Sequence, residues 1–263
     1  MKFYTNVQMI GDQFLVRGYE NGEYIQFREK YSPTLFVPSK KKTFYRTLDG
    51  EYVEPIKPGT VSDCRDFMKR YSEVDNFKVY GNERYIYQYI SDKYPQDEIK
   101  FDPSKIRLVT VDIETRSENG FPDVETADQE ILLITIQDYN TKEITTWGQG
   151  PFKVKQDNVY YIQFNNERDL LNSFMDWWMQ NTPDVVTGWN IQLFDIPFIA
   201  KRVDRVLGEK LAKRLSPWGL VSQKEVYIKG RRQIFYDIGG ITQLDYLDLY
   251  KKFTYTNQES YRL

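Results

Sequence analysis

The sequence RLVTVDIE at residues 107–114, together with ILLITIQ at residues 131–137, decides the predicted fold. Both segments are nearly continuous aliphatic runs, which are typical of central strands covered on both faces of a sheet. Shorter runs at 144–147, 159–163 and 184–188 predict further strands. The sequence therefore predicts a sheet with the first two segments among its central strands.

Segments with helical spacing lie between and after these strands. Residues 167–180 predict a helix, because its large apolar residues form one stripe: Leu170, Leu171, Phe174, Trp177 and Trp178. A second helix is predicted from about Pro197 to Leu207, with Gly208 near its end. Residues 224–238 predict a hairpin, so this part of the chain is expected to be a mixed α/β domain.

The first half of the chain has a different pattern. Residues 1–56 alternate aromatic and β-branched residues, and Glu20-Asn21-Gly22 is a strong signal for a β-hairpin. A helix capped by Thr60 or Ser62 is expected next, then a strand at 77–80 and a helix at 82–94.

A linker is predicted at residues 95–104, where prolines and acids replace apolar residues. The expected organisation is therefore two domains, at residues 1–102 and 103–263.

The composition excludes several kinds of chemistry. The 263 residues include no histidine and a single cysteine, Cys64. Catalytic triads with histidine, His-ligated zinc and an intrachain disulfide are therefore excluded, and one cysteine suits a reducing cytoplasm. Any catalysis must use carboxylates, tyrosine, lysine or a hard metal ion.

The distribution of charge and of apolar residues also constrains the function. The net charge is only −2, but residues 107–138 carry eight acids and two bases, whereas residues 201–232 carry ten bases and three acids. An acidic site beside a basic flank suits a metal-dependent enzyme that acts on a polyanion, and two oppositely charged solvated faces are the simpler alternative. The longest apolar run, at 131–136, is far shorter than the ~20 residues that span a bilayer, so no membrane association is expected.

Asp112 and Glu114 are the first candidate metal ligands. They lie two residues apart in a predicted strand, so their side chains leave the same face. Carboxylates that converge without histidine or cysteine favour Mg²⁺ or Mn²⁺ over zinc. Two such ions activate a water and stabilise a leaving oxygen in phosphodiester hydrolysis.

Asp195 is the third candidate. It lies in the segment GWNIQLFDIPFIAKR at 188–202, just before Pro197 at a predicted helix start. The common role for an aspartate in that place is to cap the helix. An Asp-x-Glu on one strand followed some eighty residues later by such an aspartate is a far more specific combination than either element alone.

Three segments resemble a known family. VDIET at 111–115, TGWNIQLFDIPFIAKR at 187–202 and LDYLDLYKKFTYTNQESYRL at 244–263 closely resemble the N-terminal part of the family B DNA polymerases of tailed bacteriophages. The first two resemble the first and second motifs of the proofreading 3′→5′ exonuclease. The resemblance implies an α/β (α+β) chain in which a β-rich N-terminal domain precedes a ribonuclease H-like exonuclease domain with a mixed sheet.

The resemblance also implies roles for single residues. Asp112 would bridge two divalent ions, Mg²⁺ or Mn²⁺, Glu114 would bind the ion that carries the attacking water, and Asp195 would bind the second ion. Phe121 resembles the aromatic residue that packs against the frayed primer end, with an ordinary loop anchor as the alternative. Asn190 matches the asparagine of the family's GWN. Two roles for it remain as alternatives, which are shaping the backbone and contacting the substrate.

Other parts of the family's pattern are expected beyond the end of this sequence. The family's third motif, a tyrosine three residues before a final metal-binding aspartate, is expected beyond residue 263, as are the palm, fingers and thumb. Asp245 and Asp248 are spaced like ligands, but the resemblance implies that their segment is structural. The expectation is a fragment with an incompletely formed exonuclease site, weak activity and no polymerase active site.

Three functions follow as alternatives. The first is two-metal 3′→5′ hydrolysis of the terminal phosphodiester of single-stranded DNA, and the second is non-catalytic binding of single-stranded nucleic acid through aromatic stacking and residues 201–232. The third is RNA binding by residues 1–100, for which KKKTFYR at 40–46 is the local support and a solvated loop an equal explanation. The expected partners are a single-stranded DNA 3′ end, the remainder of the polymerase and, in the third case, RNA, in the host cell cytoplasm.

Overall fold

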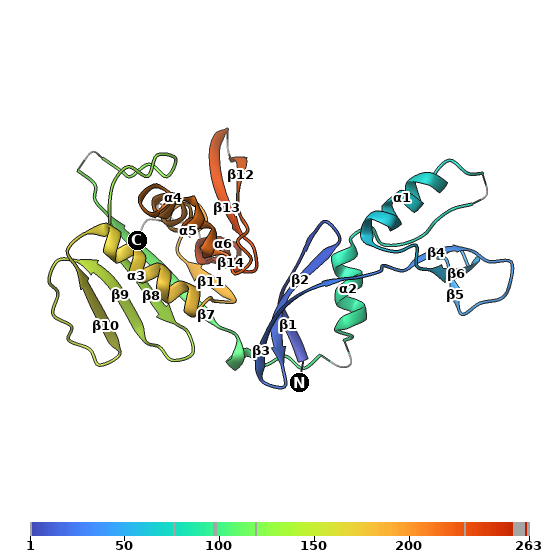
Figure 1. Ribbon diagram of the computed structural model, residues 1–263, viewed down its shortest axis with the longest axis horizontal. Coiled ribbons are helices and arrows are strands. Elements are labelled where there is room, and N and C mark those ends of the chain that lie inside the picture. The colour runs from blue at the N-terminus through green and yellow to red at the C-terminus, as the bar shows by residue number, and fades with distance from the viewer. Residues whose placement is uncertain are drawn as a thin grey trace. The chain divides into compact units, whose positions relative to one another are not determined.

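The chain divides into two compact units, Met1–Asp102 and Pro103–Leu263, here called unit 1 and unit 2. The computed structural model describes residues 2–75, 77–96, 99–118, 120–228, 230–254 and 261 (Figure 1). The boundary between the units lies within the segment 95–104, which the sequence predicts to be a linker.

Unit 1 contains two antiparallel sheets of three strands each. The first has the order β1-β2-β3, formed by β1 (Lys2–Ile10), β2 (Gln13–Glu20) and β3 (Glu23–Lys30). The second has the order β4-β6-β5, formed by β4 (Leu35–Pro38), β5 (Tyr45–Arg46) and β6 (Tyr52–Ile56). Asn21 and Gly22 both have positive φ angles at the turn between β2 and β3, which confirms the hairpin predicted from that dipeptide.

Two helices complete unit 1. Helix α1 (Val61–Tyr71) begins with a capping box in which Thr60 accepts a hydrogen bond from the backbone N–H of Asp63, as the sequence predicts. Helix α2 (Tyr85–Lys93) buries Tyr85 and Tyr89, and the ring of Tyr89 stacks on Phe14 of β2 with ring centroids 4.6 Å apart. The predicted strand at 77–80 is wrong, because within it only Tyr80 pairs, in an isolated bridge with Phe36.

Unit 2 is built on a six-stranded mixed sheet with the order β10-β9-β8-β7-β11-β14. Its strands are β7 (Leu108–Thr115), β8 (Ile131–Asp138), β9 (Ile144–Gln149), β10 (Val159–Phe164), β11 (Val185–Gly188) and β14 (Thr242–Asp245). The pairs β7–β8 and β8–β9 are antiparallel, whereas β9–β10, β7–β11 and β11–β14 are parallel. The prediction of a mixed α/β sheet with residues 107–114 and 131–137 at its centre is therefore confirmed.

The prediction that β7 is covered on both faces is wrong. Val109, Val111 and Ile113 are buried, but the alternate residues Asp112 and Glu114 are exposed. The aliphatic residues face the helices that cover one side of the sheet, and the carboxylates leave the opposite side.

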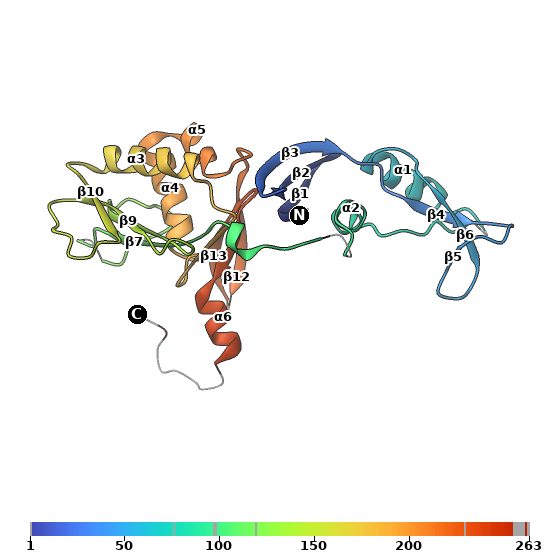
Figure 2. The same ribbon diagram turned by 90° about the horizontal axis from the view of Figure 1, so that it is seen from below.

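The covering helices of unit 2 are α3 (Glu167–Gln180) and α4 (Asp195–Leu207), followed by α5 (Glu209–Ala212) (Figures 1 and 2). Their apolar residues form one core with the buried side of the sheet, including Leu170, Phe174, Trp178, Phe198 and Val203. Helix α3 has the bounds that its apolar stripe predicts, and α4 begins two residues before the predicted Pro197.

The remaining elements of unit 2 are short or project from the sheet. Strands β12 (Val221–Ile228) and β13 (Arg231–Ile238) form the predicted antiparallel hairpin. Helix α6 (Tyr246–Phe253) follows β14 directly (Figure 1), and 3₁₀ turns lie at Pro103–Lys105 and Lys213–Leu215.

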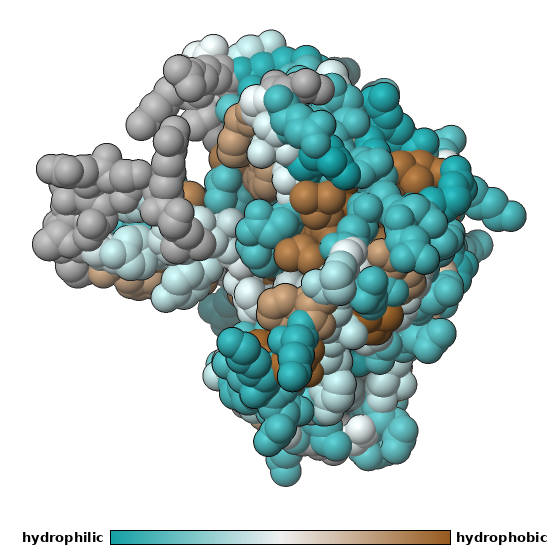
Figure 3. Space-filling view, turned by 90° about the vertical axis from the view of Figure 1, so that its left-hand side faces the viewer, coloured by the Kyte–Doolittle hydropathy of each residue, from teal (hydrophilic) through white to brown (hydrophobic). Residues whose placement is uncertain are grey.

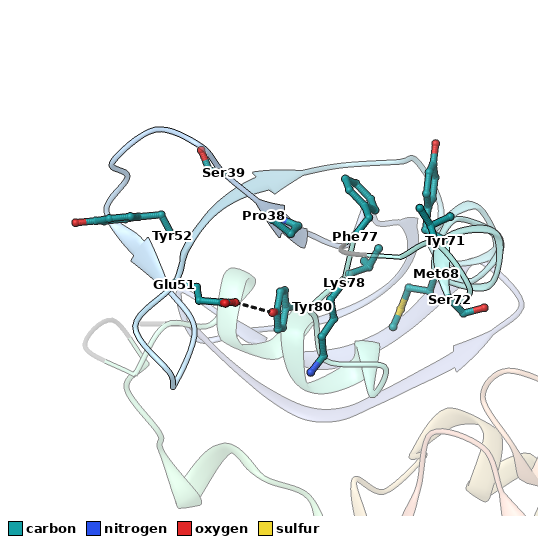
Figure 4. Close-up of a pocket in the computed structure, with 12 residues that line it drawn as sticks. Pro38, Ser39, Glu51, Tyr52, Met68, Tyr71, Ser72, Phe77, Lys78 and Tyr80 are labelled. Carbon is teal, nitrogen blue, oxygen red and sulfur yellow. Dashed lines mark hydrogen bonds between the residues drawn. The ribbon is translucent and has the colours of Figure 1, made fainter.

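Two surface features belong to single units. The side of unit 2 that faces the viewer in Figure 3 is mainly hydrophilic, with its hydrophobic residues in small separate groups. Unit 1 contains a pocket of about 720 Å³ walled by aromatic residues, where the Tyr80 hydroxyl donates a hydrogen bond of 3.2 Å to Glu51 (Figure 4). None of the helices among the described residues is long and apolar enough to cross a membrane.

Candidate functional site

The first two candidate acids lie side by side on β7. Asp112 pairs with Thr135 and Glu114 with Leu133 of the neighbouring β8, so both carboxylates leave the sheet on the face opposite the helices. The Asp112 side chain is exposed, but the protein atoms around its carboxylate desolvate it in part and raise its pKa.

Asp195 occupies a very different environment close by. It is the first residue of α4 rather than the residue that caps it, and only 4% of it is exposed. Its Oδ1 accepts a hydrogen bond of 3.1 Å from the backbone N–H of Ile113, which lies between Asp112 and Glu114. Burial, and after it the negative charge of Asp112, raises the pKa of Asp195 to about 7, and the hydrogen bond from Ile113 places the Asp195 carboxylate beside the strand that carries Asp112.

The turn between β11 and α4 delivers Asp195 to this place. Gly188 ends β11, and a Cβ there would lie 2.3 Å from the Ile191 side chain and 2.5 Å from the carbonyl oxygen of Val111, so only glycine fits. Asn190 has a φ angle of +62°, a left-handed conformation that asparagine tolerates better than most residues. Its carbonyl accepts hydrogen bonds from the N–H groups of Leu193 and Phe194.

Asp245 holds this turn in place from the end of β14. Its Oδ1 accepts hydrogen bonds from the backbone N–H groups of Asn190 (3.0 Å) and Leu247 (2.9 Å), and its Oδ2 accepts one from Gln192 (3.1 Å). The Leu247 contact also makes Asp245 the N-cap of α6. Asp245 therefore has a structural role, while Asp248 is exposed on α6.

An aromatic pocket of about 480 Å³ lies next to the turn. Phe121 and Phe194 form part of its wall, with their ring centroids 5.4 Å apart, and Asn190 lines it as well. Phe121 is 85% exposed, so its ring is available for stacking. Arg232 contributes a positive charge to the pocket while bridging Glu125 (3.1 Å) and Glu225 (2.5 Å).

The donor set fits a hard divalent cation in its chemistry. Asp112 and Asp195 supply carboxylate oxygens whose mutual repulsion a cation would relieve, and oxygen-only sites select Mg²⁺ or Mn²⁺. Glu114 lies on the same face of β7, but within the described part of the chain no three acidic or cysteine side chains are close enough to hold an ion together. The pair that the fold brings together is thus Asp112 and Asp195.

Two further residues of the site were missed in the sequence. Phe194 lines the pocket directly before Asp195, and its position next to a candidate ligand is a signal that could have indicated it. Arg232 lies in the basic segment 201–232, but its place beside Phe121 depends on the β12–β13 hairpin and has no local sequence signal.

Comparisons with known proteins show the family of the chain. Residues 57–263 match the family described as DNA polymerase family B, exonuclease domain. The whole chain is 35% identical over 289 aligned positions to the DNA-directed DNA polymerase of Enterobacteria phage T4, of which it covers 32%. It is 34% identical over 291 positions to that of Escherichia phage RB69, also covering 32%. A DNA polymerase 037L of Invertebrate iridescent virus 6 is 29% identical over 65% of the chain and 15% of its own length.

The chain spans about a third of the length of the two phage relatives that it matches. The family match includes both β7 and the segment from β11 to α4, and with them Asp112, Glu114, Phe121, Asn190 and Asp195. A mixed sheet flanked by α3 and α4 fits the ribonuclease H-like fold. The chain therefore belongs to the family B DNA polymerases and carries their exonuclease domain.

Proposed function

We propose that this chain supplies the proofreading 3′→5′ exonuclease of a phage family B DNA polymerase, which hydrolyses the 3′-terminal phosphodiester of single-stranded DNA. The observation that carries the proposal is the approach of Asp195 to Asp112 across the Ile113 hydrogen bond, beside a pocket walled by Phe121 and Phe194. Acidic oxygens next to an aromatic pocket suit a metal-assisted cut at a stacked terminal nucleotide.

Exonuclease domains of this family are divalent-metal nucleases in general, and the residues here are suited to hold Mg²⁺ or Mn²⁺. Asp112 and Asp195 would bind the metal, and Glu114, on the same face of β7 as Asp112, would contribute a further carboxylate. A bound ion supplies an activated water and stabilises the leaving oxygen. Since the chain has no histidine, the proton of the attacking water has no imidazole acceptor here.

The remaining side chains would bind and orient the substrate. Phe121 and Phe194 offer ring faces on which a splayed terminal base can stack, and such contacts do not depend on the sequence of the strand. Arg232 at the pocket is suited to a phosphate oxygen. Asn190 shapes the turn through its backbone, and its place in the pocket wall also allows a contact with the terminal nucleotide.

The relatives' names extend the proposal to partners. Because both phage relatives are DNA-directed DNA polymerases, we infer that unit 2 acts together with polymerase domains, that unit 1 is the N-terminal domain of such a polymerase, and that both act in the host cell cytoplasm. The basic residues Lys40, Lys41, Lys42 and Arg46 of unit 1 are exposed, which suits a solvated loop as well as an RNA contact, so they favour neither.

The test is degradation of a single-stranded oligonucleotide with a labelled 5′ end in the presence of Mg²⁺ or Mn²⁺. We expect stepwise shortening from the 3′ end, which stops in the Asp112→Ala/Glu114→Ala variant and on an oligonucleotide with a blocked 3′ end. Tight binding without shortening would instead support a non-catalytic single-strand-binding module. Failure both to bind and to shorten the strand would contradict both functions.

A further inference from the structure

A buried ion pair joins the two helices that cover the sheet. Arg202 of α4 donates from Nε to Oε1 of Glu167 and from a terminal nitrogen to Oε2, both at 2.6 Å, and Glu167 is the first residue of α3. The two side chains are only 8% and 7% exposed. A bidentate pair of this kind has a fixed geometry, because the planar guanidinium and the carboxylate match in shape.

The remaining hydrogen-bonding groups of the pair contact one segment, residues 120–131, which leads into β8. The other terminal nitrogen of Arg202 donates to the carbonyl oxygens of Ala127 (2.8 Å) and Asp128 (3.2 Å). Oε1 of Glu167 also accepts the backbone N–H of Ile131, where β8 begins (2.8 Å). Ala127 has a φ angle of +40° and is fully buried, so this end of the loop is held in a conformation that alanine seldom adopts.

The anchored end of the loop is connected to Phe121 at its other end. Gln129, which follows the two anchored carbonyls, is 7% exposed and donates from Nε2 to the carbonyl oxygen of Gly120 (3.2 Å). Gly120 directly precedes Phe121, whose exposed ring lies 5.4 Å from that of Phe194. Hydrogen bonds and the backbone between them thus connect the ion pair to the pocket wall.

Helix α4 contributes to both sides of the site. Its first residue is Asp195, and Arg202 lies two turns further along the same helix. Arg205, one turn after Arg202, donates to the carbonyl oxygen of Thr126 (3.1 Å). The helix that presents the metal-site carboxylate therefore also holds the loop that presents the aromatic ring.

We propose that Arg202 and Glu167 are positioning residues for the terminal base, which fix the segment 120–131 so that Phe121 faces the exonuclease pocket at a set place relative to Asp195. The proposal rests on the proposed exonuclease function. It differs from a purely structural role of the pair, because it requires that loss of the pair act on DNA through Phe121.

The test measures binding of a single-stranded oligonucleotide with 2-aminopurine at its 3′ end, in EDTA so that no hydrolysis occurs. Quenching of the terminal 2-aminopurine reports stacking. We expect Phe121→Ala to raise Kd by about tenfold, the size of a lost base–aromatic stack. Arg202→Lys keeps the positive charge but loses the bidentate contact of the guanidinium with Glu167. Glu167→Gln keeps an oxygen that can accept the N–H of Ile131. Each variant is expected to raise Kd by about three- to tenfold and to weaken the quenching of 2-aminopurine.

The decisive measurement is the double variant Phe121→Ala/Arg202→Lys. If Arg202 acts through Phe121, the Kd of the double variant equals that of Phe121→Ala within about twofold. The reason is that Arg202→Lys can no longer affect stacking once the ring of Phe121 is absent. The matched controls Arg168→Lys and Asp176→Asn, both on exposed side chains of α3 outside the basic segment 201–232, are expected to bind like the wild type. Circular dichroism at the assay temperature verifies that each variant is folded.

Three results would overturn the proposal. The first is wild-type Kd and quenching in folded Arg202→Lys and Glu167→Gln variants, and the second is a double variant whose effects multiply. The third is unchanged hydrogen exchange at the amides of residues 127–131 in Glu167→Gln, which can be measured even if Arg202→Lys does not fold. If the wild-type chain does not bind the single-stranded 3′ end at all, the variants cannot be compared. That result contradicts the proposed function itself rather than the positioning role of Arg202 and Glu167.

Discussion

The carboxylate of Asp195 accepts a hydrogen bond from the backbone N–H of Ile113, at a distance of 3.1 Å. Ile113 points into the core, while its neighbours Asp112 and Glu114 point away from it. A single main-chain contact therefore joins the start of α4 to the strand that carries the other two acids. It holds the Asp195 carboxylate against the backbone of the strand that carries Asp112.

This arrangement predicts an unusual pH dependence of stability in the absence of metal. The pKa of Asp195 is raised to about 7 in the folded state, whereas it is about 4 in an unfolded chain. The folded state therefore binds this proton more tightly, and its contribution to stability is present below about pH 4 and lost as the pH rises to 7. The loss amounts to roughly 4 kcal/mol at most, from about 1.4 kcal/mol per pKa unit.

The measurement is urea unfolding at pH 5 and pH 8 in EDTA for the wild type and for Asp195→Asn, which keeps an acceptor for Ile113. We expect the variant to be the more stable of the two at pH 8, with the difference shrinking at pH 5. Other groups titrate in both proteins and cancel in the comparison. Parallel pH dependences of the two proteins would show that Asp195 is ionised normally.

A second prediction concerns divalent metal. An ion that binds Asp112 and Asp195 relieves their repulsion and stabilises the folded state by mass action. We expect millimolar Mn²⁺ to raise the Tm of the wild type at pH 8 and to have no such effect on Asp112→Ala. Asp248→Ala removes an exposed acid from α6 and serves as the control, with the full shift retained. An equal shift in Asp112→Ala would place the ion elsewhere.

Much of the fold could be predicted because the deciding signals are local. The apolar stripe of α3 and the Asn21-Gly22 turn act over a few residues, so the sequence specifies them without tertiary context. The predicted strand at 77–80 failed for the opposite reason. Its apolar residues line a pocket in unit 1, and Tyr80 pairs only with Phe36.

The sequence indicates the candidate acids of the site, whose assignment stays a prediction, but it does not indicate the residues that support them. Asp112, Glu114 and Asp195 belong to segments with a recognisable spacing, and the fold brings Asp195 to Asp112. The roles of Asp245 and Arg202 depend on contacts across fifty or more residues, to Asn190 and to Ala127 respectively. An aspartate that caps a helix and an arginine on a helix have no local signal for such contacts.

A third prediction tests the structural role of Asp245. Asp245→Ala removes the cap of α6 and leaves the N–H groups of Asn190 and Gln192 without their acceptor. Loss of a cap costs about 1 kcal/mol, and each of the two part-buried donors left unpaired costs about 1–3 kcal/mol, so we expect a loss of at least about 3 kcal/mol in the free energy of unfolding. Urea unfolding at pH 7 measures it, with Asp248→Ala expected to change stability by less than about 0.5 kcal/mol. Equal effects of the two changes would show that the turn does not depend on Asp245.

The last prediction concerns the choice of substrate. The pocket beside Asp195 is walled by Phe121 and Phe194, and a base must leave its partner strand before it can stack there. Unpairing costs a few kcal/mol in a duplex and nothing in a single strand, so we expect a single strand with a free 3′ end to bind at least tenfold more tightly than a blunt duplex of the same length. The affinity for a duplex with a mismatched 3′ end is expected to lie between the two, because its terminal pair is already weakened.

Binding should also weaken as salt rises, since phosphate contacts release counterions. Arg232→Gln should reduce the slope of log Kd against log salt by about 0.7, the value for one contact on a single strand. Fluorescence anisotropy in EDTA measures all of these affinities. Phe121→Ala separates stacking from charge, because it should reduce the preference for single strands while leaving the salt slope unchanged. Equal affinity for duplex and single strand at moderate salt, in a wild-type chain that shortens neither, would contradict a pocket built for a frayed 3′ end.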